Sequence, residues 1–202
     1  MIRPMMVALL MALTGAAALA QSRQIASPPG ESASEVLGRH DERQGYVGGK
    51  WLEIKYGRPI KRGRNLFGLK DSADALNDGA PVWRAGANVS TRLKTEVPLT
   101  IGGTAIAPGE YTMFIDLKPN AWTFIVSRWA ASPVFPGTKD ALFGAFDYTP
   151  AKDVVRVPMK LETLTDSVEQ LTWNFENTSD AGGRLAMTWD RMKASVPFTV
   201  AK

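Results

Sequence analysis

Apolar and polar side chains alternate in several short segments of the chain, and this period of two limits the fold more than any other feature. The alternation is clearest in residues 52–56, 89–93 and 171–175. Successive side chains of a β-strand point to opposite faces of its sheet, so each segment predicts a strand with one buried face. Turn-forming residues separate the segments at spacings typical of an all-β protein.

The turn residues predict how these strands connect. Residues 99–106 hold Gly102-Gly103 between two short apolar segments, and both glycines tolerate the positive φ of a tight hairpin turn. Pro158 lacks an N–H group, so residues 155–161 are predicted to lie at a sheet edge or to contain a bulge. We expect about nine or ten strands and little helix. The predicted fold is an antiparallel β-sandwich, jelly-roll-like, because two stacked sheets bury one face of each strand.

Residues 1–20 have the features of a secretory signal peptide. A positive charge precedes the apolar run at residues 5–13, and an Ala-Leu-Ala cleavage site closes the segment. The alternative is a transmembrane anchor. A membrane span needs about 20 apolar residues, and this run is interrupted at Thr14. We expect cleavage after residue 20, which leaves the mature chain without a transmembrane anchor.

The composition restricts the possible chemistry and indicates the compartment. With no cysteine and one histidine, the chain forms no disulfide, thiolate metal site or cysteine nucleophile. An exported chain without disulfides indicates a bacterial periplasmic or secreted protein. The net charge of +4 is too small to indicate a polyanion, so we expect no nucleic acid partner. The oligomeric state is left open.

No cofactor or metal is expected. Asp71, Asp74 and Asp78 supply the oxygen ligands that calcium prefers, but they lack the glycine and the terminal glutamate of a calcium-binding loop.

We expect a single domain over residues 32–202, preceded by a flexible tether at residues 21–31. Residues 39–49 are charged and rich in glycine, which predicts a surface loop. The single histidine, His40, lies in this loop and is expected to be exposed, since no serine or cysteine partner is recognisable.

Two segments differ from ordinary strands and turns, and both combine arginine, an aromatic residue and glycine. Residues 56–68 carry four basic side chains and no acidic one, and residues 82–88 lead into the strand near residue 89. The planar arginine side chain suits carboxylate or phosphate groups and stacks on aromatic rings. Glycine lets the backbone approach a ligand closely. The predicted ligand site consists of Tyr56, Arg58, Arg64, Trp83, Arg84 and Asn88.

The expected ligand is small and anionic or carbohydrate-like, and an envelope partner is a further possibility. The structural alternative is that Arg58 or Arg84 pairs with a buried carboxylate, while Trp83 fills the core and Asn88 satisfies loop backbone. Of the tryptophans, those expected in the core are Trp122, Trp173 and Trp189. Those that remain candidates for ligand contacts are Trp51, Trp83 and Trp129.

Several motifs occur in an order and spacing that resemble a known family. They are Tyr56-Gly57-Arg58-Pro59, Trp83-Arg84-x-Gly86-Ala87-Asn88, Ile101-Gly102-Gly103, Pro108-Gly109-x-Tyr111, Asp147-Tyr148, Asp153-Val154-x-Arg156-Val157 and Leu171-x-Trp173. Together they resemble the exported bacterial family catalogued as domain of unknown function 2911, over residues 32–200. The resemblance implies an exported β-sandwich-like domain and no established activity. Against the family's usual form, residues 39–49 look like a loop insertion, and residues 71–80 replace a shorter turn.

The sequence favours a binding module over an enzyme. The alternative is a carboxylate-dependent hydrolase acting on glycans, which needs two carboxyl groups about 5–10 Å apart. The available carboxylates are Glu53, Glu110, Asp116, Asp147 and Asp153. Glu110 and Asp147 are the first candidates, since both are expected near strand ends. A Gly-x-Ser-x-Gly motif for a nucleophilic serine is absent.

Overall fold

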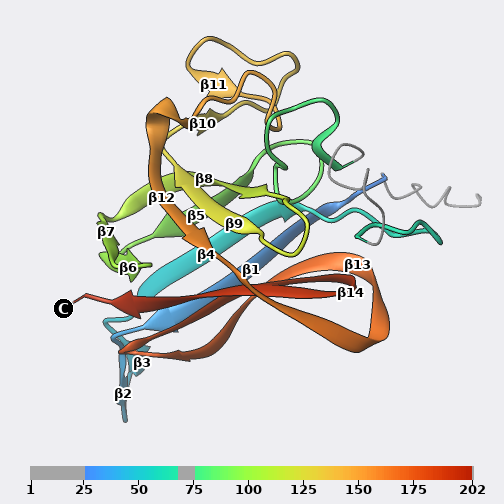
Figure 1. Cartoon of the computed structure of the whole chain (residues 1–202). Coiled ribbons are helices and arrows are strands. Elements are labelled where there is room, and N and C mark those ends of the chain that lie inside the picture. Colours follow the sequence, from blue (N-terminus) through green and yellow to red (C-terminus); the bar gives the residue numbers. More distant parts are fainter. Residues whose placement is uncertain (1–25, 68–75, 202) are drawn as a thin grey trace, which may run out of the picture.

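The computed structural model describes residues 26–67 and 76–201, which form two stacked antiparallel β-sheets (Figure 1). The predicted all-β sandwich is confirmed. The two larger sheets have six and four strands, in agreement with the number expected. The predicted signal peptide at residues 1–20 lies outside the described residues, as do residues 21–25 of the tether, Asp71 and Asp74.

The larger sheet has the strand order β1-β4-β5-β8-β9-β12, and every neighbouring pair is antiparallel. Its strands are β1 (Pro29–Val36), β4 (Lys50–Gly57), β5 (Thr91–Thr95), β8 (Gly109–Asp116), β9 (Thr123–Ser127) and β12 (Asp153–Pro158). Because this order follows the chain, the sheet is a meander. The protein therefore resembles a jelly roll in the stacking of its two sheets, while the path of its chain through the larger sheet is different.

The smaller sheet has the order β13-β14-β6-β7. Its strands are β6 (Leu99–Ile101), β7 (Thr104–Ile106), β13 (Lys160–Ser179) and β14 (Gly182–Val200). The predicted turn between β6 and β7 is confirmed, since Gly102 and Gly103 have φ values of 57° and 80°. β13 and β14 form one long hairpin, in which shifts of register mark bulges.

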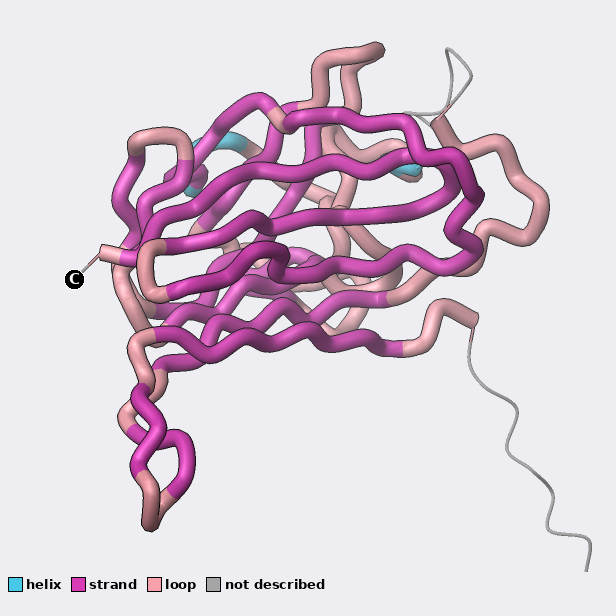
Figure 2. Tube along the Cα trace, turned by 90° about the horizontal axis from the view of Figure 1, so that it is seen from below, coloured by secondary structure: helices cyan, strands magenta, loops and turns pink. Residues whose placement is uncertain are grey.

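A short hairpin of β2 (Arg39–Asp41) and β3 (Gly45–Val47) projects from the sandwich (Figure 2). These residues lie at the surface, as expected of the predicted loop, and six of them pair as two short strands. The Asp41 carboxylate accepts hydrogen bonds from two backbone N–H groups of the turn, and this organises the hairpin. His40 is exposed, as predicted.

The main core lies between the two sheets and is built by the inward face of each strand. Fully buried side chains of the larger sheet include Leu52, Ile54, Leu93, Met113 and Ile115. Those of the smaller sheet include Leu171, Trp173, Leu185 and Met187. The predicted burial of Trp122, Trp173 and Trp189 is confirmed.

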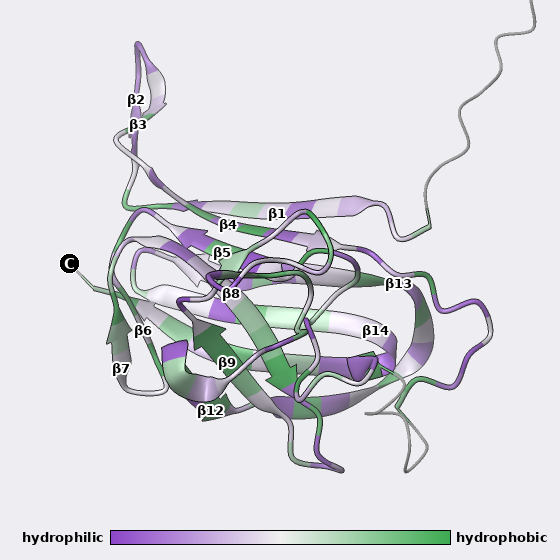
Figure 3. Ribbon diagram, turned by 90° about the horizontal axis from the view of Figure 1, so that it is seen from above, coloured by the Kyte–Doolittle hydropathy of each residue, from purple (hydrophilic) through white to green (hydrophobic). Residues whose placement is uncertain are grey.

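A second, smaller core covers the outer face of the larger sheet. Phe114 of β8 and Ile125 of β9 pack there against Leu142, Ala145 and Tyr148. The covering layer includes a two-stranded parallel pair, β10 (Ala130–Ala131) with β11 (Ala141–Leu142), and the 3₁₀ helix Pro150–Lys152. With both faces covered, β9 is apolar along most of its length instead of alternating (Figure 3).

Both sides of the sandwich are closed by contacts between edge strands. On one side β1 lies against β13, and the Ser32 hydroxyl donates a hydrogen bond to the Trp173 carbonyl. On the other side β12 lies against β7. β12 is the last strand of its sheet and ends at Pro158, so the predicted edge position of this proline is confirmed.

Two strand boundaries differ from the predictions. β1 begins at Pro29, within the predicted tether, because proline is tolerated at the first residue of an edge strand. The predicted strand at residues 155–161 is divided between β12 and β13. The chain passes from one sheet to the other next to Pro158, which has no N–H group to continue the pairing.

The turn between β6 and β7 allows a paired test of the contact with β12. A Cβ atom on Gly102 would lie 2.3 Å from Cγ1 of Val157, whereas one on Gly103 would have nothing within 4 Å. Gly103→Ala should cost about 1 kcal/mol of unfolding free energy, from the positive φ alone. Gly102→Ala should cost about 2–3 kcal/mol, because overpacking adds to that strain. Urea unfolding of both variants checks this, and equal losses would show that the contact with Val157 is unimportant.

Candidate functional site

The start of β1, the end of β4 and the start of β5 meet at one end of the sandwich. The antiparallel register brings them together, since Pro29 pairs with Gly57 and Lys55 pairs with Arg92. Backbone at strand ends is free to form loops, so this end is where both arginine-containing segments of the sequence are placed.

At this end of the sheet, a loop takes the place of the residues that would extend β5 toward its N-terminal side. Thr91 pairs with Met113 of β8, and in a continuous strand residue 89 would pair with Ile115. Trp83 takes that position instead, with two backbone hydrogen bonds to Ile115 of 2.8 and 2.9 Å. Residues 84–90 consequently leave the sheet as a loop.

Buried donors hold this loop in place. The Ala85 carbonyl accepts hydrogen bonds from Trp173 Nε1 at 2.9 Å and from Thr91 Oγ1 at 3.0 Å. Trp83 Nε1 donates to the Gly86 carbonyl at 3.2 Å. Ala85 has a φ of 54°, a left-handed conformation that costs about 1–2 kcal/mol for a residue with a Cβ atom. These contacts offset that cost and fix the path of the loop.

Gly57, at the end of β4, lets the loop lie directly against the sheet. A Cβ atom at this position would be 2.1 Å from the Ala87 carbonyl oxygen, a backbone atom that cannot move aside without moving the loop. Glycine is therefore required here by a close backbone approach.

A pocket of about 560 Å³ opens beside the loop, and we call it the arginine pocket. It is lined by aromatic and charged side chains from four separate parts of the chain. They include Arg64, Asp78, Trp83, Arg84, Asn88, Phe135, Phe143, Phe146 and Trp189.

Trp83 and Trp189 belong to the core and line the pocket from the inside. Both are about 1% exposed, and their rings stack with centroids 6.1 Å apart. Phe135 is 62% exposed, and its ring makes edge contacts with Phe143 and Phe146 at centroid distances of 5.7 Å. The pocket thus has a packed wall of indoles and an exposed wall of phenylalanines.

The Arg84 side chain, 13% exposed, lies between the loop and the outer layer. Its Nη1 donates to the Asn88 carbonyl at 3.3 Å, and Nη2 lies 3.3 Å from Asp78 Oδ2. The guanidinium is 5.7 Å from the centroid of the Phe146 ring. These contacts hold the guanidinium in one position at the pocket wall.

Arg64 supplies a second guanidinium, and its contacts are of a different kind. Its Nε donates to the Lys61 carbonyl at 2.9 Å, and Nη2 donates to the Ile60 carbonyl at 2.7 Å. The group lies 5.7 Å from the Trp189 ring centroid. Both acceptors are neutral, so they orient the guanidinium without neutralising its charge.

A second pocket of about 520 Å³ adjoins the first, and we call it the tyrosine pocket. Its lining includes Pro29, Gly30, Glu31, Lys55, Tyr56, Gly57, Val89, Ser90 and Arg92. Ser27, Ala87 and Asn88 line both pockets.

The structure brings together four of the six predicted site residues. Arg64, Trp83, Arg84 and Asn88 line the arginine pocket. Tyr56 lines the tyrosine pocket and is only 6% exposed, with its hydroxyl 3.4 Å from the Trp173 carbonyl. Arg58 lines neither. Whether these residues bind a ligand stays a prediction.

The contacts of Arg58 are with the opposite sheet. Its Nε donates to the Leu171 carbonyl at 3.3 Å, and Nη2 donates to Thr172 Oγ1 at the same distance. Arg58 thus ties the end of β4 to β13.

Lys61, in the same basic segment, has a carboxylate partner. Its Nζ lies 2.5 Å from Asp190 Oδ1 and also donates to Ser167. Burial alone would raise the pKa of Asp190, but the hydrogen bonds from Lys61 and Ser167 outweigh it and lower the pKa. The charge of Lys61 is therefore largely compensated, whereas Arg64 has no carboxylate partner among the described residues.

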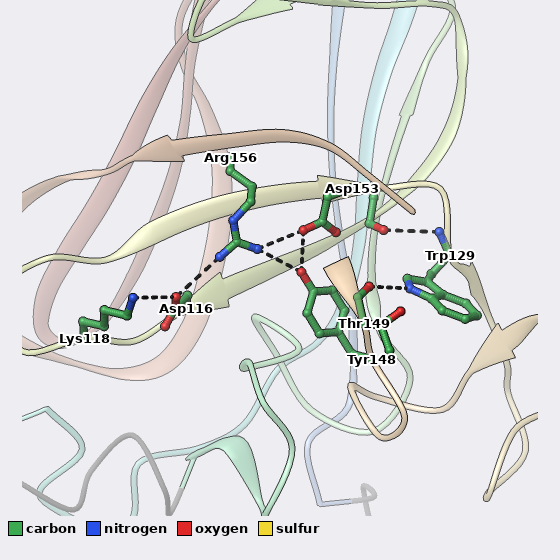
Figure 4. Close-up of polar contacts among 8 residues, drawn as sticks. Asp116, Lys118, Trp129, Tyr148, Thr149, Asp153 and Arg156 are labelled. Carbon is green, nitrogen blue, oxygen red and sulfur yellow. Dashed lines mark hydrogen bonds and ion pairs between the residues drawn. The ribbon is translucent and has the colours of Figure 1, made fainter. Parts of the chain in front are cut away.

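A polar cluster that was not predicted from the sequence lies on the outer face of the larger sheet (Figure 4). Arg156 Nη1 lies 2.9 Å from Asp153 Oδ2, and its Nη2 lies 3.5 Å from Asp116 Oδ2. The Tyr148 hydroxyl donates to Asp153 Oδ2 at 2.5 Å and accepts from Arg156 at 3.0 Å. The cluster ties the outer layer to β8 and β12, and neither of the two pockets reaches it.

The remaining candidates lie apart from the pockets. Trp51 is 44% exposed on β4. Trp129 donates to the Thr149 carbonyl and is covered by Lys152, whose Nζ is 3.8 Å from the ring centroid. The phenylalanines of residues 135–146 were missed, because they follow no strand or helix period. The one sign of them in the sequence is that three phenylalanines occur within a single irregular segment.

Within residues 26–67 and 76–201, no group of three acidic or histidine side chains is placed to hold a metal ion. The same residues include no helix with the length and apolar character needed to cross a membrane.

The fold and the pockets define a class: a β-sandwich protein with an aromatic, arginine-lined pocket at one end of its sheets. The family model described as "Protein of unknown function (DUF2911)" matches residues 39–198, and the chain belongs to this family. The resemblance inferred from the sequence motifs is thereby confirmed. No curated protein and no solved structure matches the chain. The match begins at residue 39, and the idea that residues 39–49 are an insertion stays a prediction.

The Tyr148 cluster predicts a specific response to alkaline pH. Burial, followed by the hydrogen bond to Asp153, raises the pKa of Tyr148 above its ordinary value of 10.0. The folded protein holds the phenolic proton more tightly than the unfolded chain does. The resulting stability is complete below pH 10 and is lost as the pH rises through the folded-state pKa.

Tyr148→Phe should therefore be less stable than wild type at neutral pH, and the difference should shrink in the alkaline range. Melting temperatures measured from about pH 7 to 11 test this. The exposed Tyr46→Phe is the control and should follow wild type throughout. A constant difference between Tyr148→Phe and wild type would mean that the phenol does not titrate as described.

Proposed function

We propose that this protein is a non-enzymatic binding module and that its arginine pocket takes a small organic anion. The observation that carries the proposal is the pair of oriented guanidiniums, Arg64 and Arg84, at the wall of one aromatic pocket. Among the residues that the structure describes, the pocket lining holds two arginines and one carboxylate, Asp78. A positively charged pocket with apolar walls strengthens the attraction of an anion.

The aromatic walls favour a ligand with a flat or apolar body. Rings of Phe135, Phe143 and Phe146 offer their faces and edges at the exposed side of the pocket. A sugar ring would also stack on these rings, so the binding test below includes sugars. The positive charge of Arg64 favours an anion over a neutral sugar.

The glycan hydrolase alternative gains less support from the pockets. Glycoside hydrolysis needs two carboxyl groups about 5–10 Å apart. Of the acidic residues within 26–67 and 76–201, Asp78 alone lines the arginine pocket and Glu31 alone lines the tyrosine pocket. Glu110 and Asp147 are both exposed and line neither pocket.

The proposed place of action is the bacterial periplasm or the medium, on the basis of the signal-like residues 1–20. Expression of the full chain in a bacterium, followed by mass spectrometry of the exported fraction, tests this. The mature protein should begin at Gln21. Recovery of the uncleaved chain in the membrane fraction would contradict it.

Binding is tested by calorimetry and thermal shift with benzoate, phthalate, citrate, phosphate, glucose and N-acetylglucosamine. At least one organic anion should raise the melting temperature. Arg84→Met should weaken its binding by about tenfold or more, because a hydrogen bond to a charged group contributes about 1.5–3 kcal/mol.

Arg58→Met is the matched control, since Arg58 bonds to β13 and lines neither pocket. It should lower the melting temperature and leave the affinity unchanged. Equal losses of affinity in both variants, or no response to any compound, would overturn the proposal. A response to the sugars alone would identify the ligand as carbohydrate.

A further inference from the structure

We infer that the ligand extends from the arginine pocket into the tyrosine pocket, and that its class is an amphiphilic anion. Its charged group lies at Arg64 and Arg84, and an unbranched apolar chain occupies the space beside Tyr56. The inference rests on the proposed function and narrows it to one kind of anion.

The two pockets are neighbours with a common wall. Ser27, Ala87 and Asn88 line both of them. A hydrogen bond from Asn88 Nδ2 to the Ser27 carbonyl joins two of these residues at 3.4 Å, the long end of the range for such bonds. Asn88 is exposed. The Asn88 side chain is thus one of the three groups that separate the two spaces.

The charges of the tyrosine pocket are paired within the protein. Lys55 Nζ lies 3.6 Å from Glu31 and 3.4 Å from Glu53. Arg92 lies 4.0 Å from Glu110 on the neighbouring strand. Lys55 and Arg92 thus have partners of opposite charge, whereas among residues 26–67 and 76–201 no carboxylate is paired with Arg64. Carboxylates therefore balance most of the charge that lines the tyrosine pocket, although Arg92 Nε is buried without a hydrogen-bond partner among the described residues.

The rest of the tyrosine pocket suits an apolar chain. Pro29, Ala87 and Val89 contribute aliphatic surface, and Gly30 and Gly57 contribute backbone without side chains. Tyr56 is 6% exposed and its hydroxyl is turned to the Trp173 carbonyl of the opposite sheet, so its side chain adds little accessible surface to the pocket. Burying methylene groups against such surface is favourable for each one added.

The volumes agree with a ligand of two parts. Each pocket lies within the range of about 300–1,000 Å³ that is usual for small-molecule sites. A compact anion such as acetate would fill a small part of the first pocket and none of the second.

The test compares straight-chain carboxylates that have the same charge and different lengths: acetate, hexanoate and decanoate, below their micellar concentrations. Isothermal titration calorimetry should show binding that tightens with length, with decanoate at least about tenfold tighter than acetate. Decanol, which has the chain without the charge, should bind much more weakly than decanoate.

Val89→Trp places a large side chain in the tyrosine pocket and should abolish most of the advantage of decanoate over acetate. Val134→Trp is the matched control. Val134 is 67% exposed and lines neither pocket, so this variant should bind both acids as wild type does.

Asn88→Gly gives an independent test, because glycine accepts the φ of 62° while the side chain between the pockets is removed. It should increase the preference for decanoate.

The outcomes separate this inference from the proposed function. If aromatic anions bind in an Arg84-dependent way and chain length has no effect, the inference fails and the proposed function stands. If no anion binds, both fail. If decanoate keeps its advantage in Val89→Trp and loses it in Phe135→Ala, the chain lies against the phenylalanines and the tyrosine pocket is not used.

Discussion

The hydrogen bond from the Trp173 indole to the Ala85 carbonyl is the contact on which the geometry of the pocket end depends. Trp173 is fully buried between the sheets, and its partner carbonyl belongs to a loop of the larger sheet. Its own carbonyl accepts hydrogen bonds from Ser32 of β1 and Tyr56 of β4. One residue of the smaller sheet thereby positions two strands and a loop of the other. An unsatisfied buried carbonyl costs about 1–3 kcal/mol, so the arrangement is strongly specified.

The walls of the arginine pocket differ in how firmly they are held. The Trp83 and Trp189 rings are part of the main core and stack on each other, so that wall is shaped by folding itself. Phe135 contacts Phe143 and Phe146 at the surface, on a segment with few buried residues. A ligand would meet one preformed wall and one wall able to adjust, and preformed contacts reduce the entropy cost of binding.

Much of the fold follows from the sequence because it depends on local patterns. Alternation located β4 and part of β13, a glycine pair located the hairpin turn, and Pro158 located a sheet edge. The site could be predicted only in part. Arg58 and Arg84 both follow an apparent strand end in the sequence, and they differ in their hydrogen-bond partners. Arg58 bonds to a residue 113 positions away, whereas Arg84 bonds to one 6 positions away. Such long-range pairing leaves no local signal. The phenylalanines near residue 140 were missed for the same reason, since they are brought to the pocket by packing of the outer layer.

The closure of both sides of the sandwich has a consequence for self-association. Exposed edge strands are templates onto which a second chain can add a strand, and such addition leads to aggregates. Here β1 lies against β13 and β12 lies against β7, while β12 ends in a proline that donates no hydrogen bond. The folded chain, which has no cysteine for disulfide crosslinks, thus presents few such templates to neighbouring copies. The projecting β2–β3 hairpin, which carries the half-exposed Tyr46, is a separate element that this closure does not cover.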